Sequence, residues 1–198
     1  MTAPGFRRGP VGRVATAGIR PSFVVASAAL VLAANATCAT NSASAENRRG
    51  GAPEGGVGGP VPELVVQRLN GKSIAVSSLR GKVVLLDVWA SWCGPCKKEL
   101  PALDGIASRL KSRGVEILAV SIDQERENVD KFVATQSKWS LTLAHDANGA
   151  IADKLQPATM PTSYVIDRAG IIRAINSGFV PADAPGIEKR LADLASAK

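Results

Sequence analysis

Val-Val-Leu-Leu-Asp-Val-Trp-Ala-Ser-Trp-Cys-Gly-Pro-Cys-Lys, residues 83–97, is the stretch that decides the fold. Its first part, residues 83–90, is almost continuously apolar and predicts a strand that is buried on both faces. The stretch from about 97 to 112 has apolar residues at helical spacing and predicts a helix. The two cysteines, Cys93 and Cys96, therefore lie where a buried strand passes into a helix.

This cysteine pair predicts redox chemistry, because two cysteines separated by two residues can form a disulfide with each other. A helix N-terminus offers free N–H groups and a partial positive charge, and cysteines there titrate at roughly 3.5–7.5 instead of about 8.5. Cys93 is the predicted nucleophile, and Cys96 would resolve the mixed disulfide that Cys93 forms with a substrate. Pro95 suits the first helical turn, and Gly94 leaves the sulfur open. We expect both to contact substrate.

A metal site is an alternative use of such a pair. Structural zinc needs four ligands, and beyond the pair the chain has only Cys38 and one histidine, His145. We expect His145 to be solvated in a polar loop, so no metal or other cofactor is predicted. Copper delivery through Cys93 and Cys96 with His145 stays open, as does an inert structural disulfide.

The segment from Asp87 to Pro101 resembles the active-site segment of thioredoxins, and the wider pattern resembles the TlpA/ResA branch of extracytoplasmic thiol-disulfide oxidoreductases, which is related to the AhpC/TSA redoxins. Asp87 precedes Cys93 by six residues. The resemblance implies that it is a buried aspartate that moves a proton to or from Cys96, with a pKa raised by desolvation. An aspartate at a strand end that reaches solvent or a backbone N–H is the alternative.

A second segment, Met160-Pro161-Thr162, stands before an apolar strand and resembles the cis-proline loop of this family. The resemblance implies that the loop faces the dithiol and that Met160 and Pro161 bind an extended substrate. A cis bond before proline costs only about 0.5–1 kcal/mol against trans, so tertiary contacts can hold it. Trp92 would shield the nucleophile and contact substrate, whereas Trp89 is expected to pack in the core.

The rest of the chain predicts a domain over residues 62–198. Asn70-Gly71 is a hairpin signal between two short apolar runs. A three-layer α/β thioredoxin fold follows, with a mixed central β-sheet, helices on both faces and an N-terminal β-hairpin extension. The helix over 128–137 resembles the insertion of the TlpA/ResA type. The remaining predicted strands are 64–69, 73–76, 115–123, 139–143, 162–167 and 171–176, and the remaining helices are 149–155 and 184–197.

The first 45 residues predict an export segment. The apolar run 22–34 is shorter than the roughly 20 residues of a membrane span and follows a basic stretch, as in a signal peptide. Residues 43–45, Ala-Ser-Ala, offer a cleavage site. A lipid on Cys38 and an uncleaved membrane anchor stay open. Residues 46–61 are rich in glycine and proline and predict a flexible linker.

The positive charge of the chain is uneven. Of the formal +7, four arginines in residues 1–45 contribute +4 without any acid, which leaves +3 for the remainder. There is no basic stripe with interleaved aromatic residues, so the sequence excludes nucleic acid as a partner.

Together these features predict an exported thiol-disulfide oxidoreductase in the bacterial periplasm or at the outer face of the cytoplasmic membrane. Gly-Pro between the cysteines is similar to thioredoxin, with a potential of about −270 mV, and unlike DsbA at about −120 mV. This favours a reductase of disulfides in exported proteins. The resemblance implies apocytochrome c haem-site cysteines as one substrate and a membrane electron donor of the CcdA/DsbD kind. Oxidase, isomerase and peroxide-linked activities are the alternatives, although the Pro-x-x-x-Thr/Ser-x-x-Cys pattern of peroxide enzymes is missing.

Overall fold

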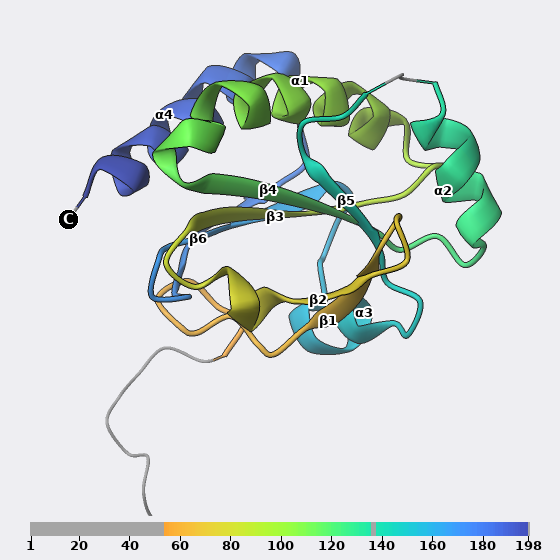
Figure 1. Ribbon diagram of the computed structural model, residues 1–198, viewed down its shortest axis with the longest axis horizontal. Coiled ribbons are helices and arrows are strands. Elements are labelled where there is room, and N and C mark those ends of the chain that lie inside the picture. The colour runs from red at the N-terminus through yellow and green to blue at the C-terminus, as the bar shows by residue number, and fades with distance from the viewer. Residues whose placement is uncertain (1–53, 136–137, 198) are drawn as a thin grey trace, which may run out of the picture. The chain divides into compact units, whose positions relative to one another are not determined.

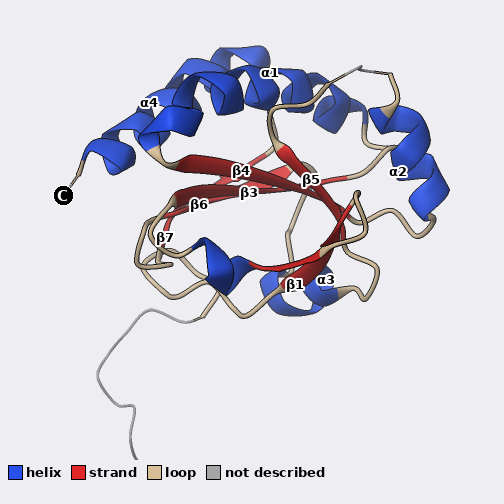
Figure 2. Cartoon of the chain, in the orientation of Figure 1, coloured by secondary structure: helices blue, strands red, loops and turns tan. Residues whose placement is uncertain are grey.

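The computed structural model describes residues 54–135 and 138–197. A mixed sheet lies at the centre of this part of the chain, with helices on both of its faces (Figures 1 and 2). Its strands are β1 (Val65–Arg68), β2 (Ser73–Ala75), β3 (Val83–Trp89), β4 (Val115–Ser121), β5 (Thr142–His145), β6 (Thr162–Ile166) and β7 (Ile172–Ser177). They follow one another across the sheet in the order β2-β1-β5-β4-β3-β6-β7.

The helices cover the sheet from two sides. They are α1 (Gly94–Leu110), α2 (Arg126–Val133), α3 (Ala150–Leu155) and α4 (Ala184–Ser196), with short 3-10 turns at Val76–Leu79, Lys111–Arg113 and Pro181–Asp183. Figure 1 shows α1 and α4 on one face and α3 on the other. This arrangement confirms the predicted three-layer thioredoxin fold with a mixed sheet. None of the helices in the described residues is long and apolar enough to cross a membrane.

Strand β3 is the centre of the sheet. All of its residues are buried, and it runs parallel to β4 on one side and antiparallel to β6 on the other. Leu86, for example, pairs with both Leu118 and Tyr164. A strand with neighbours on both sides and helices on both faces has no exposed surface, which explains its nearly continuous apolar sequence.

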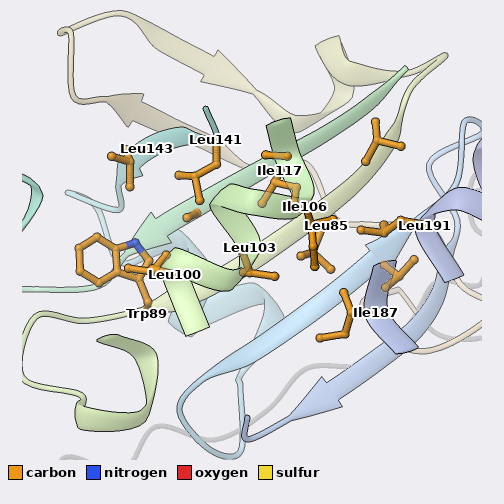
Figure 3. Close-up of a cluster of buried hydrophobic side chains, with 14 of the residues drawn as sticks. Leu85, Trp89, Leu100, Leu103, Ile106, Ile117, Leu141, Leu143, Ile187 and Leu191 are labelled. Carbon is orange, nitrogen blue, oxygen red and sulfur yellow. The ribbon is translucent and has the colours of Figure 1, made fainter. Parts of the chain in front are cut away.

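Successive side chains of β3 point to opposite faces of the sheet and therefore belong to two different layers of the core. Leu85 and Trp89 point toward α1 and α4, where they pack with residues such as Leu103 (Figure 3). Leu86 points to the opposite face, which carries α3. Because successive side chains of a strand alternate between faces, Asp87 lies on the same side as Leu85 and Trp89. The strand thus directs one carboxyl group into the layer beneath α1.

The hairpin of β1 and β2 extends the sheet beyond β5. Val66 pairs with Ile74 across the hairpin, and Gln67 pairs with His145 of β5. Gly71 in the turn has a φ of 82°, a left-handed conformation that favours glycine.

The folded part begins before the predicted boundary at Pro62. Gly58 N–H donates to the Ile172 carbonyl over 2.8 Å, and Ile172 N–H donates to the Gly59 carbonyl over 2.9 Å. Val61 is buried. The prediction of a flexible linker up to residue 61 is therefore wrong for this stretch, because its backbone pairs with the outer edge of β7, which otherwise has unpaired groups.

The fifth strand also starts later than predicted. The sequence indicated a strand over 139–143, whereas β5 begins at Thr142. The N–H groups of Ser140 and Leu141 donate to the Asp104 carboxylate of α1 instead of joining the sheet. A side chain distant in sequence satisfies this backbone, which no local pattern could indicate.

Candidate active site

Cys93 and Cys96 form a disulfide at the N-terminus of α1, with their Cα atoms 5.3 Å apart. Cys93 caps the helix, and its Sγ accepts a hydrogen bond from the Cys96 N–H over 3.2 Å. Cys93 is 5% exposed and Cys96 is fully buried, so Cys93 is the more accessible of the two cysteines. A Cβ on Gly94 would meet no atom within 4 Å, which leaves the space beside the disulfide open.

The predicted substrate-contacting residues lie around the end of β3. Thr162 of β6 pairs with Val88 of β3, so the preceding Pro161 lies at the sheet edge where β3 leads into the disulfide. The Met160–Pro161 bond is cis. Trp92, directly before Cys93, is 66% exposed. Trp89, in contrast, is fully buried in the core, as predicted.

Asp87 is fully buried beneath α1. Neither of its carboxylate oxygens has a hydrogen-bond partner among the described residues. Burial raises the pKa of this carboxyl well above its ordinary value, and the nearby charge of Glu99 raises it further. The alternative in which Asp87 reaches solvent is wrong, because β3 is covered on both faces.

Glu99 is a second buried acid that the sequence reasoning missed. It follows Cys96 by three residues and therefore lies on the same face of α1. Its side chain is almost completely buried, and Oε2 has no hydrogen-bond partner within the part of the chain described. Burial, followed by the charge of Asp183, raises its pKa to about 7. Its position on the stripe of Cys96, Leu100 and Leu103 was the signal that could have revealed it.

Asp123 is a third buried acid, just beyond the end of β4, and it is fully bonded. Its carboxylate accepts from the Ser91 N–H at 2.8 Å, from the Ser91 hydroxyl at 2.6 Å and from the Ser121 hydroxyl at 2.6 Å. Ser91 belongs to the short connection between β3 and the disulfide. The sequence reasoning assigned no role to any of these residues, since nothing local joins Ser91 to a residue of the next strand.

His145 is not in a solvated loop, so that prediction is wrong. It is the last residue of β5 and is 5% exposed. Strand β5 runs parallel to β4 and places His145 beside Ser121. Its Nε2 lies 2.7 Å from the Asp123 carbonyl oxygen, and because a carbonyl only accepts, Nε2 carries the proton.

Within residues 54–135 and 138–197, no group of three or more histidine, cysteine and acidic side chains is arranged to hold a metal ion. Cys38, the remaining cysteine, lies outside the described residues. The described site therefore consists of a disulfide, two buried acids with unpaired carboxylate oxygens and a third buried acid whose carboxylate accepts hydrogen bonds.

Comparison with known proteins gives a consistent result. A family model described as the AhpC/TSA family matches residues 57–175. The thiol-disulfide oxidoreductase ResA of Oceanobacillus iheyensis is 35% identical over 145 residues, which are 70% of this chain and 73% of that protein.

Solved structures agree with this result. A candidate thiol:disulfide interchange protein DsbE from Chlorobium tepidum has a TM-score of 0.65 and 31% identity, over 69% of this chain and 96% of that one. The exposed lipoprotein thioredoxin Etrx1 from Streptococcus pneumoniae has a TM-score of 0.59 and 26% identity, over 67% of this chain and all of that one. The chain belongs to the AhpC/TSA family and, within it, to the thioredoxin-like thiol-disulfide oxidoreductases of the TlpA/ResA type.

Proposed function

We propose that this oxidoreductase reduces disulfides of exported proteins, with Cys93 as nucleophile and Cys96 as the resolving thiol. The observation that carries the proposal is the asymmetry of the pair. Cys93 caps the helix N-terminus and keeps 5% of its surface accessible, whereas Cys96 is fully buried, one turn before the buried Glu99 on the same helix face. The more accessible cysteine is suited to attack a substrate, and the fully buried one is suited to finish the reaction.

The reaction consists of two exchanges. The Cys93 thiolate attacks one sulfur of the substrate disulfide, and the other substrate sulfur leaves as a thiolate. Cys96, once deprotonated, attacks Cys93 Sγ and releases the second substrate thiolate. Two electrons thereby pass to the substrate, and the protein is left with its own disulfide.

Asp87 is proposed as the group that takes the proton from Cys96. Its charge interacts with that of Glu99, which lies one turn after Cys96 on the same helix face. A carboxyl with a raised pKa can accept a proton and give it back near neutral pH. Glu99, with its pKa at about 7, is suited to share this work.

The substrate would lie across the surface formed by Trp92, Gly94, Pro95, Met160 and Pro161. Trp92 offers an exposed aromatic face beside the sulfur, and the open space at Gly94 admits another chain. The backbone of Met160 can pair with an extended segment, and this is the proposed role of the proline loop. Apocytochrome c with oxidised haem-site cysteines is one proposed substrate.

The proposed location is outside the cytoplasm, by way of residues 1–45, which the sequence predicts to be an export segment. A lipid on Cys38 is an alternative anchor, and the name of the pneumococcal relative describes that protein as an exposed lipoprotein. A reductase in an oxidising compartment needs an electron supply. We therefore propose a membrane donor of the CcdA/DsbD kind.

The reduction potential of the Cys93–Cys96 couple tests the direction of electron flow. The protein is equilibrated in glutathione or dithiothreitol buffers, and the oxidised fraction is measured by thiol alkylation. A potential at or below about −230 mV supports a reductase. A value near about −120 mV would instead identify an oxidase.

A trapping experiment tests the roles of the two sulfurs. In the Cys96→Ser variant, the mixed disulfide between Cys93 and a substrate cannot be resolved and should accumulate. The Cys93→Ser variant is the matched control and should trap nothing. Equal trapping by both variants would contradict the assignment of Cys93 as nucleophile.

A further inference from the structure

The connection between β3 and the disulfide is held by a residue from a different strand. Cys93 N–H donates to the Ala90 carbonyl over 3.1 Å, which closes a four-residue turn from Ala90 to Cys93. Ser91 and Trp92 are the two central residues of this turn. The position of the Ser91 backbone therefore determines where Trp92 and Cys93 lie.

Asp123 binds the Ser91 backbone and side chain at once. Oδ2 accepts the Ser91 N–H at 2.8 Å, and Oδ1 accepts the Ser91 hydroxyl at 2.6 Å. Two bonds from one residue to two atoms of a carboxylate fix orientation as well as distance. Because Asp123 is 3% exposed, water offers little competition for these bonds.

Asp123 is itself held from two other strands. Its Oδ2 also accepts the Ser121 hydroxyl at 2.6 Å, and its N–H donates to the same hydroxyl at 3.1 Å. His145 Nε2 holds the Asp123 carbonyl from β5. The support of the disulfide turn thus extends across β4 and β5, which are neighbouring strands of the sheet.

We propose that Asp123 is a positioning residue for thiol-disulfide exchange, acting through Ser91 to hold Cys93 and Trp92 in place for attack. In-line attack on a disulfide demands accurate placement of the attacking sulfur, and small displacements of a reacting group reduce rates strongly. Asp123 does not touch the sulfurs, so its contribution is to their placement. The inference rests on the dithiol chemistry of the family and not on the proposed direction of electron flow.

The test measures the second-order rate at which the reduced full-length protein, with Cys38→Ser in every variant so that only the dithiol reacts, is oxidised by 5,5′-dithiobis(2-nitrobenzoic acid). Attack by Cys93 releases one coloured thiolate, and attack by Cys96 on the mixed disulfide releases a second. Asp123→Ala removes both bonds to Ser91 and should slow the first release at least fivefold. Asp123→Asn keeps an acceptor oxygen and a hydrogen-bonding group in the same positions, and it should recover the rate to within threefold of the wild type.

Asp146→Ala is the matched control. Asp146 is a buried aspartate in the same neighbourhood, but its carboxylate accepts from Ala150 and Ile151 N–H of α3, both at 2.9 Å, and not from the disulfide turn. The Asp146→Ala variant should lose about as much stability as Asp123→Ala, while its rate of reaction with the disulfide reagent stays within twofold of the wild type. If Asp146→Ala is slowed as much as Asp123→Ala, the effect is general destabilisation and the proposal is wrong.

Two further outcomes would overturn the proposal. The first is a decrease of less than fivefold in Asp123→Ala, and the second is an Asp123→Asn variant as slow as Asp123→Ala. If Asp123→Ala does not fold, Ser91→Ala decides instead, since it deletes one of the two bonds and should lower the rate about threefold. An unchanged Ser91→Ala rate then rejects the role. The wild-type rate shows independently whether the dithiol reacts at all.

Discussion

Buried acids lie on two sides of the disulfide, and the two groups differ in how many hydrogen bonds their carboxylates accept. Beneath α1, Asp87 and Glu99 are buried, and both carboxylate oxygens of Asp87 and Oε2 of Glu99 have no hydrogen-bond partner in the described chain. Beyond the end of β4, Asp123 is just as deeply buried but accepts three hydrogen bonds. Burial is the same on both sides, and the hydrogen bonds are what differ.

This difference separates two physical tasks. An unpaired buried carboxylate loses its hydration without compensation, so the protein holds it more readily as the neutral acid. Such a group can exchange a proton, at a cost in stability. A carboxylate with a full set of donors keeps fixed neighbours and stabilises local geometry. The same residue type is thus suited to proton transfer on one side and to placement on the other.

The sharpest test of this comparison is the same substitution on both sides. Asp87→Ala removes a fully buried carboxyl group that has no hydrogen-bond partner among the described residues, and it should raise the free energy of unfolding by about 1–2 kcal/mol. Asp123→Ala leaves the Ser91 N–H and two hydroxyls without their acceptor, and it should lower that free energy by about 3 kcal/mol. Urea unfolding of the disulfide form measures both.

Asp87→Asn is the control for the first change, because it removes the ionisable group but keeps a polar group buried. Its gain in stability should be smaller than that of Asp87→Ala. If Asp87→Ala and Asp123→Ala shift the unfolding free energy in the same direction, the distinction between the two sides fails.

The pH dependence of stability offers the next largest effect. The pKa of Glu99 rises from an ordinary 4.5 to about 7 in the fold, so the folded state holds a proton that the unfolded state has released. Stability is therefore highest below about pH 4.5 and declines as the pH rises to about 7, by on the order of 3 kcal/mol. Glu99→Gln should remove most of this decline, as followed by urea unfolding between pH 4.5 and 8.

Glu116→Gln serves as a control of opposite sign. Burial raises the pKa of Glu116, but hydrogen bonds from Thr142 and Lys82 outweigh this, so the net pKa is lowered. The stability that Glu116 provides is present above its unfolded pKa and is lost as the pH falls. A Glu99→Gln variant with the same pH slope as the wild type would argue against an unpaired acid beneath α1.

The fold could be predicted from the sequence because its signals are local and periodic. The apolar run of β3, the helical spacing in α1 and the Asn70-Gly71 turn each reflect contacts with the nearest layer or the nearest neighbours in the chain. The errors arose where backbone groups are satisfied from far away. Gly58 pairs with β7, and Ser140 bonds to the Asp104 carboxylate of α1.

The candidate site was likewise predictable only where its residues stand close together in the sequence. Cys93 and Cys96 stand in a short motif, so the disulfide follows from their spacing. Asp123, Ser91 and His145 come from three separate segments and meet only because β3, β4 and β5 are neighbours in the sheet. Patterns in a single sequence do not show which strands become neighbours. The contacts among these three residues were therefore missed, and His145 was predicted in a loop.

The smallest effect on stability and rate is expected for Ser121→Ala, which removes hydrogen bonds to Asp123 but none to the disulfide turn. The variant loses the hydroxyl that donates to Asp123 Oδ2 and accepts from Asp123 N–H. We expect the free energy of unfolding to fall by about 1 kcal/mol, while the rate of reaction with a small disulfide changes less than twofold.

The reason for this separation is that both bonds from Ser91 to Asp123 remain in Ser121→Ala. Urea unfolding and stopped-flow kinetics of the same preparation measure the two quantities. Ser91→Ala is the counterpart, since it should lose a similar amount of stability but about threefold in rate. If Ser121→Ala is slowed as much as Ser91→Ala, placement of the disulfide turn depends on the whole buried network and not on the direct contact of Asp123 with Ser91.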